Sequence, residues 1–202
     1  MSKVVFHNSV SLDGYVAGPN DSPENPLGDG GGALFNWYFN GDTEVSVPGA
    51  PPMKMSKESA AVFGEAVKSL GIMVCGRRMF DIANAWGGTP PGTPCIVVTH
   101  HPPQEWVKEA SPFIFIEGVE NAIAKAKELS GDKPVAISSA NIAQQALKSG
   151  LLDEIHMALI PVLLGGGVRL FENTGDTPVA LETISVVEAP GVTHVGYRVV
   201  RS

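Results

Sequence analysis

Short apolar segments alternating with amphipathic helical segments are the feature that most constrains how this chain folds. Parallel strands need a crossover between them, so this alternation predicts an α/β fold with a mostly parallel central sheet and helices on both faces. The residues predicted as strands are 3–10, 72–75, 95–99, 113–116, 135–137, 154–160, 184–188 and 193–200, and those predicted as helices are 56–70, 77–86, 119–129 and 141–149.

Two stretches depart from this alternation. The last two predicted strands flank Ala189-Pro190-Gly191, a tight-turn sequence that predicts a C-terminal antiparallel hairpin. Residues 18–55 are rich in Gly and Pro and contain an aromatic cluster at 34–39. A connection of this length is typically functional or disordered, and its aromatic residues favour a packed excursion. We therefore expect residues 1–202 to form one domain, with this excursion beside its site.

Charge and composition exclude several classes of protein. With 14 Lys and Arg residues against 21 Asp and Glu, the net charge is -7, which argues against nucleic-acid binding. No apolar run reaches the roughly 18 residues of a membrane span. Cys75 and Cys95 each lie in an apolar run, so we interpret them as buried thiols of a cytoplasmic protein. His100 and His101 lack a third ligand at a suitable spacing, so no metal site is predicted.

In sheets of this class, ligands bind beyond the carboxyl ends of the strands. Gly76-Arg77-Arg78-Met79 follows one strand and opens a helix, so its backbone N–H groups and guanidinium groups predict a phosphate site. Solvated surface arginines are the alternative. Thr99 and His100 follow the next strand and either line the same site or form a plain surface turn.

Further candidate residues follow other strands. Ser139 or Asn141 can cap the helix after residue 137, and the free N–H groups and hydroxyls there can also hold a pyrophosphate. The glycines at 165–167 allow either close approach of the backbone to a flat ligand or a sharp bend. Asp13, in Ser11-Leu12-Asp13-Gly14, is the carboxylate best placed to touch a substrate, although Asp before Gly is also common in turns.

Other patterns are interpreted as structural or rejected. Residues 28–33 match a GxGxxA dinucleotide pattern, but they follow a Pro-rich loop and not a strand, so we reject a Rossmann turn. His7, His156 and His194 alternate with apolar strand residues and are assigned to the structural framework. The sequence contains no GxSxG, HExxH or phosphate-loop motif, which argues against triad hydrolases, zinc proteases and nucleotide-triphosphate enzymes.

Several of these segments together resemble a known family. Ser11-Leu12-Asp13-Gly14, Gly76-Arg77-Arg78-Met79-Phe80, Gly150-Leu151-Leu152-Asp153-Glu154 and the segments 161–171 and 192–198 occur in that order. In this combination the chain resembles, over nearly its whole length, the dihydrofolate-reductase-like proteins related to the C-terminal reductase domain of the bifunctional riboflavin-biosynthesis deaminase/reductase. The deaminase-type zinc motif is absent from the sequence, so the resemblance is to a stand-alone reductase-like domain.

The resemblance implies NADPH as hydride donor, a small-molecule substrate and a homodimer. The residues that it implies for cofactor binding are Gly76, Arg77, Arg78 and Met79 at the adenosine 2′-phosphate, Thr99 and His100 beside them, and Ser138, Ser139, Ala140, Asn141 and Ile142 at the pyrophosphate. The residues that it implies for substrate binding are Ser11, Leu12, Gly14, Pro161, Leu163 and Leu164. We expect the excursion at 18–55 to wall the cleft, with Trp37 or Tyr38 against the substrate ring. Asp13 is the candidate catalytic residue, which would orient the substrate or relay a proton.

One departure from the family pattern leaves two hypotheses. Relatives carry Gly-Gly where this chain has Ser138-Ser139, and each added Cβ crowds a pyrophosphate while each hydroxyl can instead donate to it. The leading hypothesis is an NADPH-dependent reductase of a small heterocyclic or carbonyl compound, similar to 5-amino-6-(5-phosphoribosylamino)uracil reductase or to dihydrofolate reductase. The alternative is a non-catalytic nucleotide-binding or scaffold protein of the same fold that has lost reductase activity.

Overall fold

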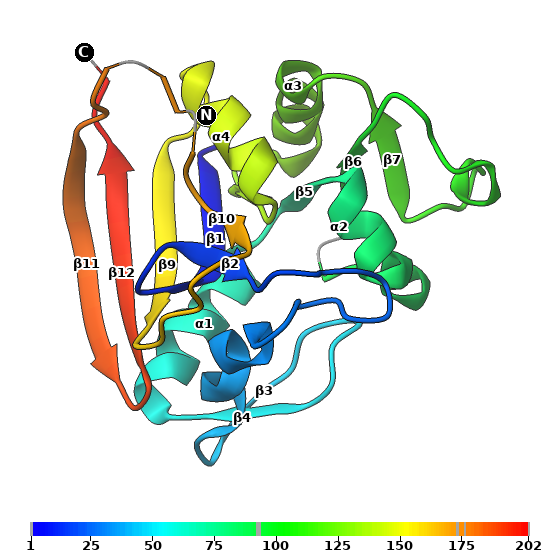
Figure 1. The fold of residues 1–202 in the computed structure, drawn as a ribbon. Helices are drawn as coiled ribbons and strands as arrows, with labels where there is room; N and C mark the ends of the chain where they lie inside the picture. The colour runs from blue at the N-terminus through cyan, green and yellow to red at the C-terminus, as the bar shows by residue number, and fades with distance from the viewer. Residues whose placement is uncertain (1, 92–93, 173, 176, 202) are drawn as a thin grey trace.

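The computed structural model describes residues 2–91, 94–172, 174–175 and 177–201. Its centre is an eight-stranded sheet, which crosses the molecule from β11 on the left of Figure 1 to β7 on the right. In spatial order the strands are β11 (Leu181–Ala189), β12 (Val192–Val199), β9 (Glu154–Ile160), β1 (Val4–Ser11), β8 (Val135–Ile137), β5 (Ile72–Gly76), β6 (Cys95–Val98) and β7 (Phe113–Ile116).

The direction of the strands determines where a ligand can bind. Strands β1, β5, β6, β7, β8 and β9 run parallel, whereas β12 pairs antiparallel with both β9 and β11. The predicted α/β fold, with its mostly parallel sheet and C-terminal hairpin, is therefore confirmed. Parallel strands end at one edge of a sheet, so the ends of β1, β5, β6, β8 and β9 lie along the same edge.

One face of the sheet carries a closely packed apolar core. Helices α3 (Val119–Ser130) and α4 (Ala140–Lys148) cover this face. Alternate residues of a strand point to opposite faces, and Val4 and Phe6 of β1 point to this one, where both are fully buried. The other large side chains of this core are Ile72, Val74, Ile96, Ile123, Ile137, Leu152 and Ile155.

The opposite face is covered by α1 (Lys57–Ser69), the short helix α2 (Arg77–Ile82) and the 3-10 helix η1 (Gly31–Phe39). Ser56 caps α1, since its side chain accepts a hydrogen bond from the backbone N–H of Ser59. The aromatic part of the excursion is ordered and packed, with Leu34 and Trp37 buried against this face. Trp37 is held there by a 3.0 Å hydrogen bond from its Nε1 to Ser9 Oγ.

The smaller elements lie outside the central sheet. The excursion and its neighbours contain β2 (Tyr15–Ala17), β3 (Thr43–Val45), β4 (Met53–Met55) and β10 (Val168–Arg169), where β2 pairs with β10 and β3 with β4. The 3-10 helix η3 (Gln104–Trp106) precedes β7. None of the helices in the described ranges is long and apolar enough to cross a membrane.

One predicted helix was wrong in its length. The pattern predicted a helix over residues 77–86, whereas α2 ends at Ile82 and a separate turn, η2 (Asn84–Gly88), follows it. Asn84, Ala85 and Trp86 have φ of 46°, 49° and 47°, which is left-handed backbone. A right-handed helix cannot continue through such residues.

Candidate functional site

A cavity of about 1390 Å³ lies on the α1 side of the sheet and extends to the carboxyl ends of its strands. Every residue assigned to cofactor binding from the sequence lines it, namely Gly76, Arg77, Arg78, Met79, Thr99, His100, Ser138, Ser139, Ala140, Asn141 and Ile142. We call this set the strand-end region. The segments that follow β5, β6 and β8 therefore converge on one cavity.

Direct contacts join the ends of these strands. The Ser139 hydroxyl accepts a 2.9 Å hydrogen bond from the backbone N–H of Gly76 and lies 3.5 Å from Met79 Sδ. Asn8 Nδ2, on β1, lies 3.4 Å from the carbonyl oxygen of Ser138. Ser139 is the N-cap residue of α4, but its side chain does not cap that helix because it binds Gly76 instead. The first N–H groups of α4 thus have no side-chain cap and lie beside the cavity.

Both arginines of the strand-end region are already paired. Arg78 binds Asp21 of the excursion through two side-chain contacts of 2.7 and 3.1 Å and one to its carbonyl oxygen. Arg77 binds Asp81 at 2.8 Å and also donates to the carbonyl oxygen of His101. A phosphate at Arg78 would therefore have to share that guanidinium with the Asp21 carboxylate or displace the carboxylate from it.

The other polar residues at this edge make local contacts. Thr99 Oγ1 accepts a hydrogen bond from the backbone N–H of His101, and His100 Nδ1 lies 2.8 Å from Glu117 Oε1 at the surface. Asn141 Oδ1 accepts a 2.6 Å hydrogen bond from Gln145. The backbone N–H groups at the start of α4 are further donors that the strand-end region offers to an anion.

Asp13 connects two loops. Its Oδ1 accepts hydrogen bonds from Ser11 Oγ at 2.6 Å and from the backbone N–H of Leu164 at 3.1 Å, and its Oδ2 accepts one from Gly165 at 2.7 Å. The hydrogen bond from Ser11, reinforced by those from Gly165 and Leu164, lowers the pKa of Asp13 from 3.8 to about 2. At neutral pH Asp13 is thus a carboxylate that accepts hydrogen bonds and has no proton to donate.

Apart from Trp37, the residues assigned to substrate binding lie on two segments that contact each other. Leu12 donates its backbone N–H to Val162, and the Asp13 contacts hold the same two segments together. Leu12 and Leu163 are 62% and 69% exposed, whereas Trp37 is buried in the core. None of the assigned substrate residues, all of which the structure describes, lines the cavity: Ser11, Leu12, Gly14, Trp37, Pro161, Leu163 and Leu164, together with Asp13.

In the part of the cavity that lies under α1, Tyr38 was predicted as an alternative to Trp37, but the histidines were not predicted as site residues. His7, His156 and His194 line it from β1, β9 and β12, together with Tyr38 of η1 and Phe63 of α1. We call these five residues the histidine region. In the β1–β9 pairing His7 stands directly opposite His156, and His194 lies on the same face of the neighbouring strand. The three histidines alternate with apolar residues in the sequence, so they were predicted to belong to the structural framework. Their common site was not predicted, because the sequence does not show which strands become neighbours.

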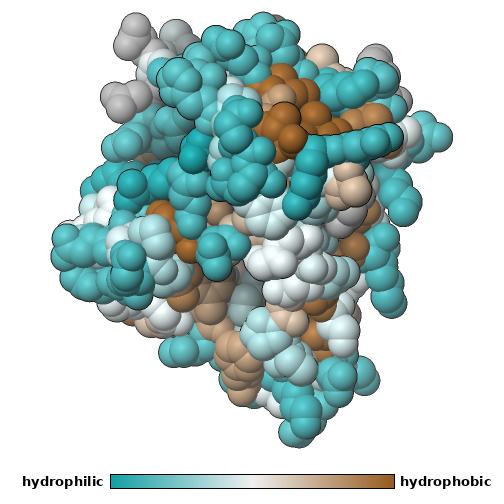
Figure 2. All heavy atoms as spheres, turned by 90° about the vertical axis from the view of Figure 1, so that its right-hand side faces the viewer, coloured by the Kyte–Doolittle hydropathy of each residue, from teal (hydrophilic) through white to brown (hydrophobic). Residues whose placement is uncertain are grey.

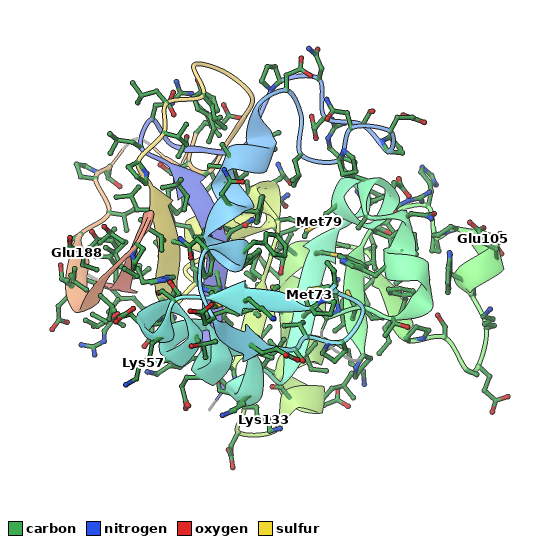
Figure 3. All side chains as sticks on the ribbon, turned by 90° about the horizontal axis from the view of Figure 1, so that it is seen from below. Lys57, Met73, Met79, Glu105, Lys133 and Glu188 are labelled. Atoms are coloured by element: carbon green, nitrogen blue, oxygen red, sulfur yellow. The ribbon has the colours of Figure 1, made fainter. Side chains whose placement is uncertain are left out.

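Met73, on β5, and Met79, in the strand-end region, mark the position of the cavity. Both line it, and Figure 3 shows them near the centre of the molecule, whereas Lys57, Glu105, Lys133 and Glu188 lie at its margins. Figure 2 presents the side of β7, which is largely hydrophilic with a compact apolar group near its upper edge.

Burial keeps His7, His194 and Tyr38 uncharged. Burial, with smaller contributions from His156 and His194, lowers the pKa of His7 from 6.5 to about 4. Burial also lowers the pKa of His194 and raises the pKa of Tyr38. His7 and His194 are therefore neutral imidazoles at neutral pH, and Tyr38 is a neutral phenol.

Polar neighbours surround two of the histidines. His194 Nε2 lies 2.9 Å from Ser59 Oγ, and His156 Nε2 lies 3.0 Å from Glu154 Oε2. Burial by itself raises the pKa of Glu154, but hydrogen bonds from Lys3 and His156 outweigh it and lower that pKa overall. In the described part of the chain no His, Cys, Asp or Glu residues cluster in a way that could hold a metal ion.

A comparison with protein families decides where this chain belongs. Residues 2–195 match the RibD C-terminal domain. The chain belongs to the RibD C-terminal domain family. No curated protein sequence matched it. The resemblance seen in the sequence is therefore confirmed.

Solved structures show the same fold at low sequence identity. A protein of Shewanella sp. PV-4 assigned to riboflavin biosynthesis is 22% identical, with full coverage of both chains and a TM-score of 0.71. The riboflavin biosynthesis reductase Rib7 of Saccharomyces cerevisiae is 14% identical, covering 98% of this chain and 90% of that one, with a TM-score of 0.60. The dihydrofolate reductase of Enterococcus faecalis, solved with NADP(H), is 13% identical, covering 98% and 96%, with a TM-score of 0.58. The fold is dihydrofolate-reductase-like.

The residues present fit a dinucleotide cofactor in size and donor type. The cavity exceeds the roughly 300–1,000 Å³ of ordinary small-molecule sites. The uncapped start of α4 offers backbone N–H donors to a pyrophosphate, and Arg77 and Arg78 lie at the same region. Ser139 turns its hydroxyl toward Gly76, so its added side chain does not need a strained backbone there.

Proposed function

We propose that this protein is an NADPH-dependent reductase of a small heterocyclic or carbonyl substrate. The observation that supports this most strongly is that all the strand-end residues assigned to cofactor binding line one cavity. Membership of the RibD C-terminal domain family supports it further, as does a dihydrofolate reductase of the same fold that was solved with NADP(H). A homodimer and a cytoplasmic location, which the family and the composition imply, are part of this proposal.

The residues of the chain would divide the work along the cavity. Arg77 and Arg78 would hold the adenosine 2′-phosphate and the start of α4 the pyrophosphate. When bound, the nicotinamide supplies the hydride, and the protein supplies orientation and electrostatics. The histidine region would then receive the substrate, because it is the remaining part of the same cavity.

Asp13 keeps a place in the proposal as an orienting group. Its ionised carboxylate fixes residues 164 and 165 relative to the end of β1, beside the segments assigned to substrate binding. Three donors already occupy its oxygens, and its low pKa leaves it without a proton at neutral pH. We therefore favour a role in positioning the loop over a role as proton donor.

The direct test is to titrate NADPH and NADH into the purified protein. Replacing both guanidinium groups (Arg77→Ala with Arg78→Ala) should weaken NADPH binding by about 10- to 100-fold and NADH binding far less, because charge-assisted hydrogen bonds to the 2′-phosphate are lost. Arg198→Ala is a matched control, since it removes a paired surface arginine outside the cavity. Equal losses for both cofactors would contradict the assignment.

Two contacts favour the alternative of a non-catalytic nucleotide-binding protein. Ser139 occupies the N–H of Gly76, and Asp21 occupies Arg78, so two anion-binding groups are engaged within the protein. Exchanging the serines for glycines (Ser138→Gly with Ser139→Gly) frees the Gly76 donor. Tighter NADPH binding without any turnover would favour this alternative, whereas turnover by the wild-type protein excludes it.

A further inference from the structure

The ion pair between Arg78 and Asp21 joins the strand-end region to the excursion. Arg78 donates to both carboxylate oxygens of Asp21, from Nη2 at 2.7 Å and from Nε at 3.1 Å, and Nη2 also donates to the Asp21 carbonyl oxygen at 3.0 Å. Arginine binds carboxylates and phosphates with the same fork of N–H donors. The Asp21 side chain is 13% exposed and that of Arg78 is 67% exposed. The carboxylate is therefore the enclosed member of the pair, and the guanidinium is the member that a ligand can reach.

The loop that carries Asp21 is held in shape by its own hydrogen bonds. Asn20 and Asn25, on either side of Asp21, both donate from their side-chain amides to the Asp29 carboxylate, at 2.7 and 2.9 Å. The backbone N–H of Asp29 donates to the carbonyl oxygen of Pro19 at 2.7 Å. These contacts close the loop on itself, so its shape holds the Asp21 carboxylate at Arg78.

The two arginines of the cavity differ in where their carboxylate partners lie. Of the Lys and Arg residues that the structure describes, those that line the cavity are Arg77 and Arg78. Arg77 binds Asp81 one turn further along α2, and Asp81 does not line the cavity. Asp21 does line it, so a ligand phosphate that reaches Arg78 meets a second anion at the same guanidinium. Such a like-charge contact disfavours one ligand relative to another that lacks the charge.

NADPH and NADH differ in the group that this contact would distinguish. NADPH carries a phosphate at the 2′ position of its adenosine ribose, where NADH carries a hydroxyl. A guanidinium suits the phosphate, whereas a carboxylate repels it and can accept a hydrogen bond from the hydroxyl. Arg78 and Asp21 place both chemistries side by side, so each reduces the preference that the other would give alone.

We infer that Asp21 is a specificity-determining residue of the cofactor site, which lowers the preference of this chain for NADPH over NADH by competing with the 2′-phosphate for Arg78. The inference rests on the proposed function, because it takes the strand-end region as the site of the cofactor phosphates. It adds to that proposal an acidic residue of the excursion, and it makes the ratio of the two cofactor affinities a property of the Arg78–Asp21 pair.

Titration of NADPH and NADH into the Asp21→Asn variant tests the inference. The exchange removes the negative charge at nearly constant shape, so NADPH should bind about 3- to 10-fold more tightly at low ionic strength, and NADH should not bind more tightly. The gain should shrink as salt is added, because exposed charges are screened. Glu24→Gln is the matched control, because it removes the same charge from an exposed side chain of the same loop that binds Ser22 and does not line the cavity.

Repeating the exchange in an Arg78→Ala background locates the effect. Without the guanidinium there is nothing for the carboxylate and the phosphate to compete for, so Asp21→Asn should change NADPH affinity by less than about twofold. An equal gain in both backgrounds would show a general effect of charge and would overturn the inference. Circular dichroism of each variant confirms that it is folded.

The titrations separate this inference from the proposed function. An unchanged ratio of NADPH to NADH affinity in Asp21→Asn, or an equal rise of that ratio in Glu24→Gln, overturns the inference even where the wild-type protein binds NADPH. Binding of NADPH by Asp21→Asn but not by the wild-type protein supports the inference and overturns the proposed function. If neither protein binds NADPH, both are overturned.

Discussion

The two faces of the central sheet are built from the same strands, but one carries a packed apolar core and the other borders the cavity. On the α3–α4 face, Val4 and Phe6 of β1 are fully buried in an apolar core. On the α1 face, the alternate residues Val5 and His7 of the same strand line the cavity. A single strand thus contributes to a packed core with one set of side chains and to a binding cavity with the other.

This difference shows how the protein separates stability from binding. The apolar cluster on the α3–α4 face holds more buried residues than either of the two clusters on the opposite face. The other face can then leave room for a ligand and carry polar groups such as His156 and His194, which a packed apolar core would not accept without partners. The experiments below test whether this division between the faces holds.

The largest expected effect is on stability, when a valine is changed to alanine once on each face. Val4→Ala should lower the free energy of unfolding by about 2–3 kcal/mol, because the packed face cannot fill the space that the lost methyl groups leave. Val5→Ala should cost less than about 1 kcal/mol, since its side chain borders a cavity that already exists. Urea denaturation of both variants measures the difference. Equal losses would show that the α1 face is as tightly packed as the other.

A pH dependence is expected from the cavity face alone. The pKa of His7 is about 4 in the folded protein and 6.5 as its ordinary value, so the unfolded chain binds more protons between these pH values. Stability should therefore fall as the pH is lowered from 6.5 toward 4, by about 2 kcal/mol from this group. In His7→Gln this fall should be smaller.

The control for this pH effect is His101→Gln, which removes an exposed histidine outside the cavity. Denaturation of the three proteins at pH 6.5, 5.5 and 4.5 provides the comparison. A decline of the same size in His7→Gln as in the wild-type protein would mean that His7 is not desolvated in the folded protein.

The smallest expected effect is local to the loop that Asp13 holds. Asp13→Asn replaces an acceptor oxygen by an NH₂ group, so the backbone amides of Leu164 and Gly165 cannot both keep their acceptors. Hydrogen exchange of these amides should become faster, while the Leu12 amide, which binds Val162, keeps its rate. In the wild-type protein the same acceleration should appear as the pH falls from about 4 to 2, when Asp13 takes up a proton.

If the amides exchange at the same rates in Asp13→Asn as in the wild-type protein, Asp13 does not anchor this loop. A catalytic role for its carboxylate would then be favoured. Asp29→Asn serves as the comparison variant, because it alters an exposed carboxylate that binds Asn20 and Asn25 and does not line the cavity.

Local patterns predicted the parts of the fold and site that depend on neighbours along the chain. The strand at 135–137 and the helix that begins beside Ser139 follow from apolar runs and capping residues, and they agree with the structure. The strand-end residues followed from a general rule about parallel sheets, so Gly76 and Ser139 were named without knowledge of their contact. The helix after Gly76 was predicted too long because left-handed backbone at Asn84 has no strong signature in the sequence.

The substrate side could not be predicted in the same way. Trp37 and Tyr38 are adjacent in an irregular excursion, and which of them faces the cavity depends on how η1 packs: Trp37 binds Ser9 in the core, and Tyr38 lines the cavity. His7, His156 and His194 are separated by long stretches of chain, and their common face exists because β9 pairs with β1 and β12. No local pattern records that pairing.

The amino-acid sequence by itself determined the alternation of strands and helices, the family, and the edge of the sheet where an anionic cofactor would bind, since each follows from short-range periodicity or from ordered motifs. The tertiary structure alone decided that the histidines meet, that Tyr38 and His7 face the cavity, and that Asp13 is occupied by Ser11 and two backbone amides. The physical reason is that these features depend on strand order and on packing between distant segments, where the contacts of a side chain are set by neighbours that lie far away along the chain.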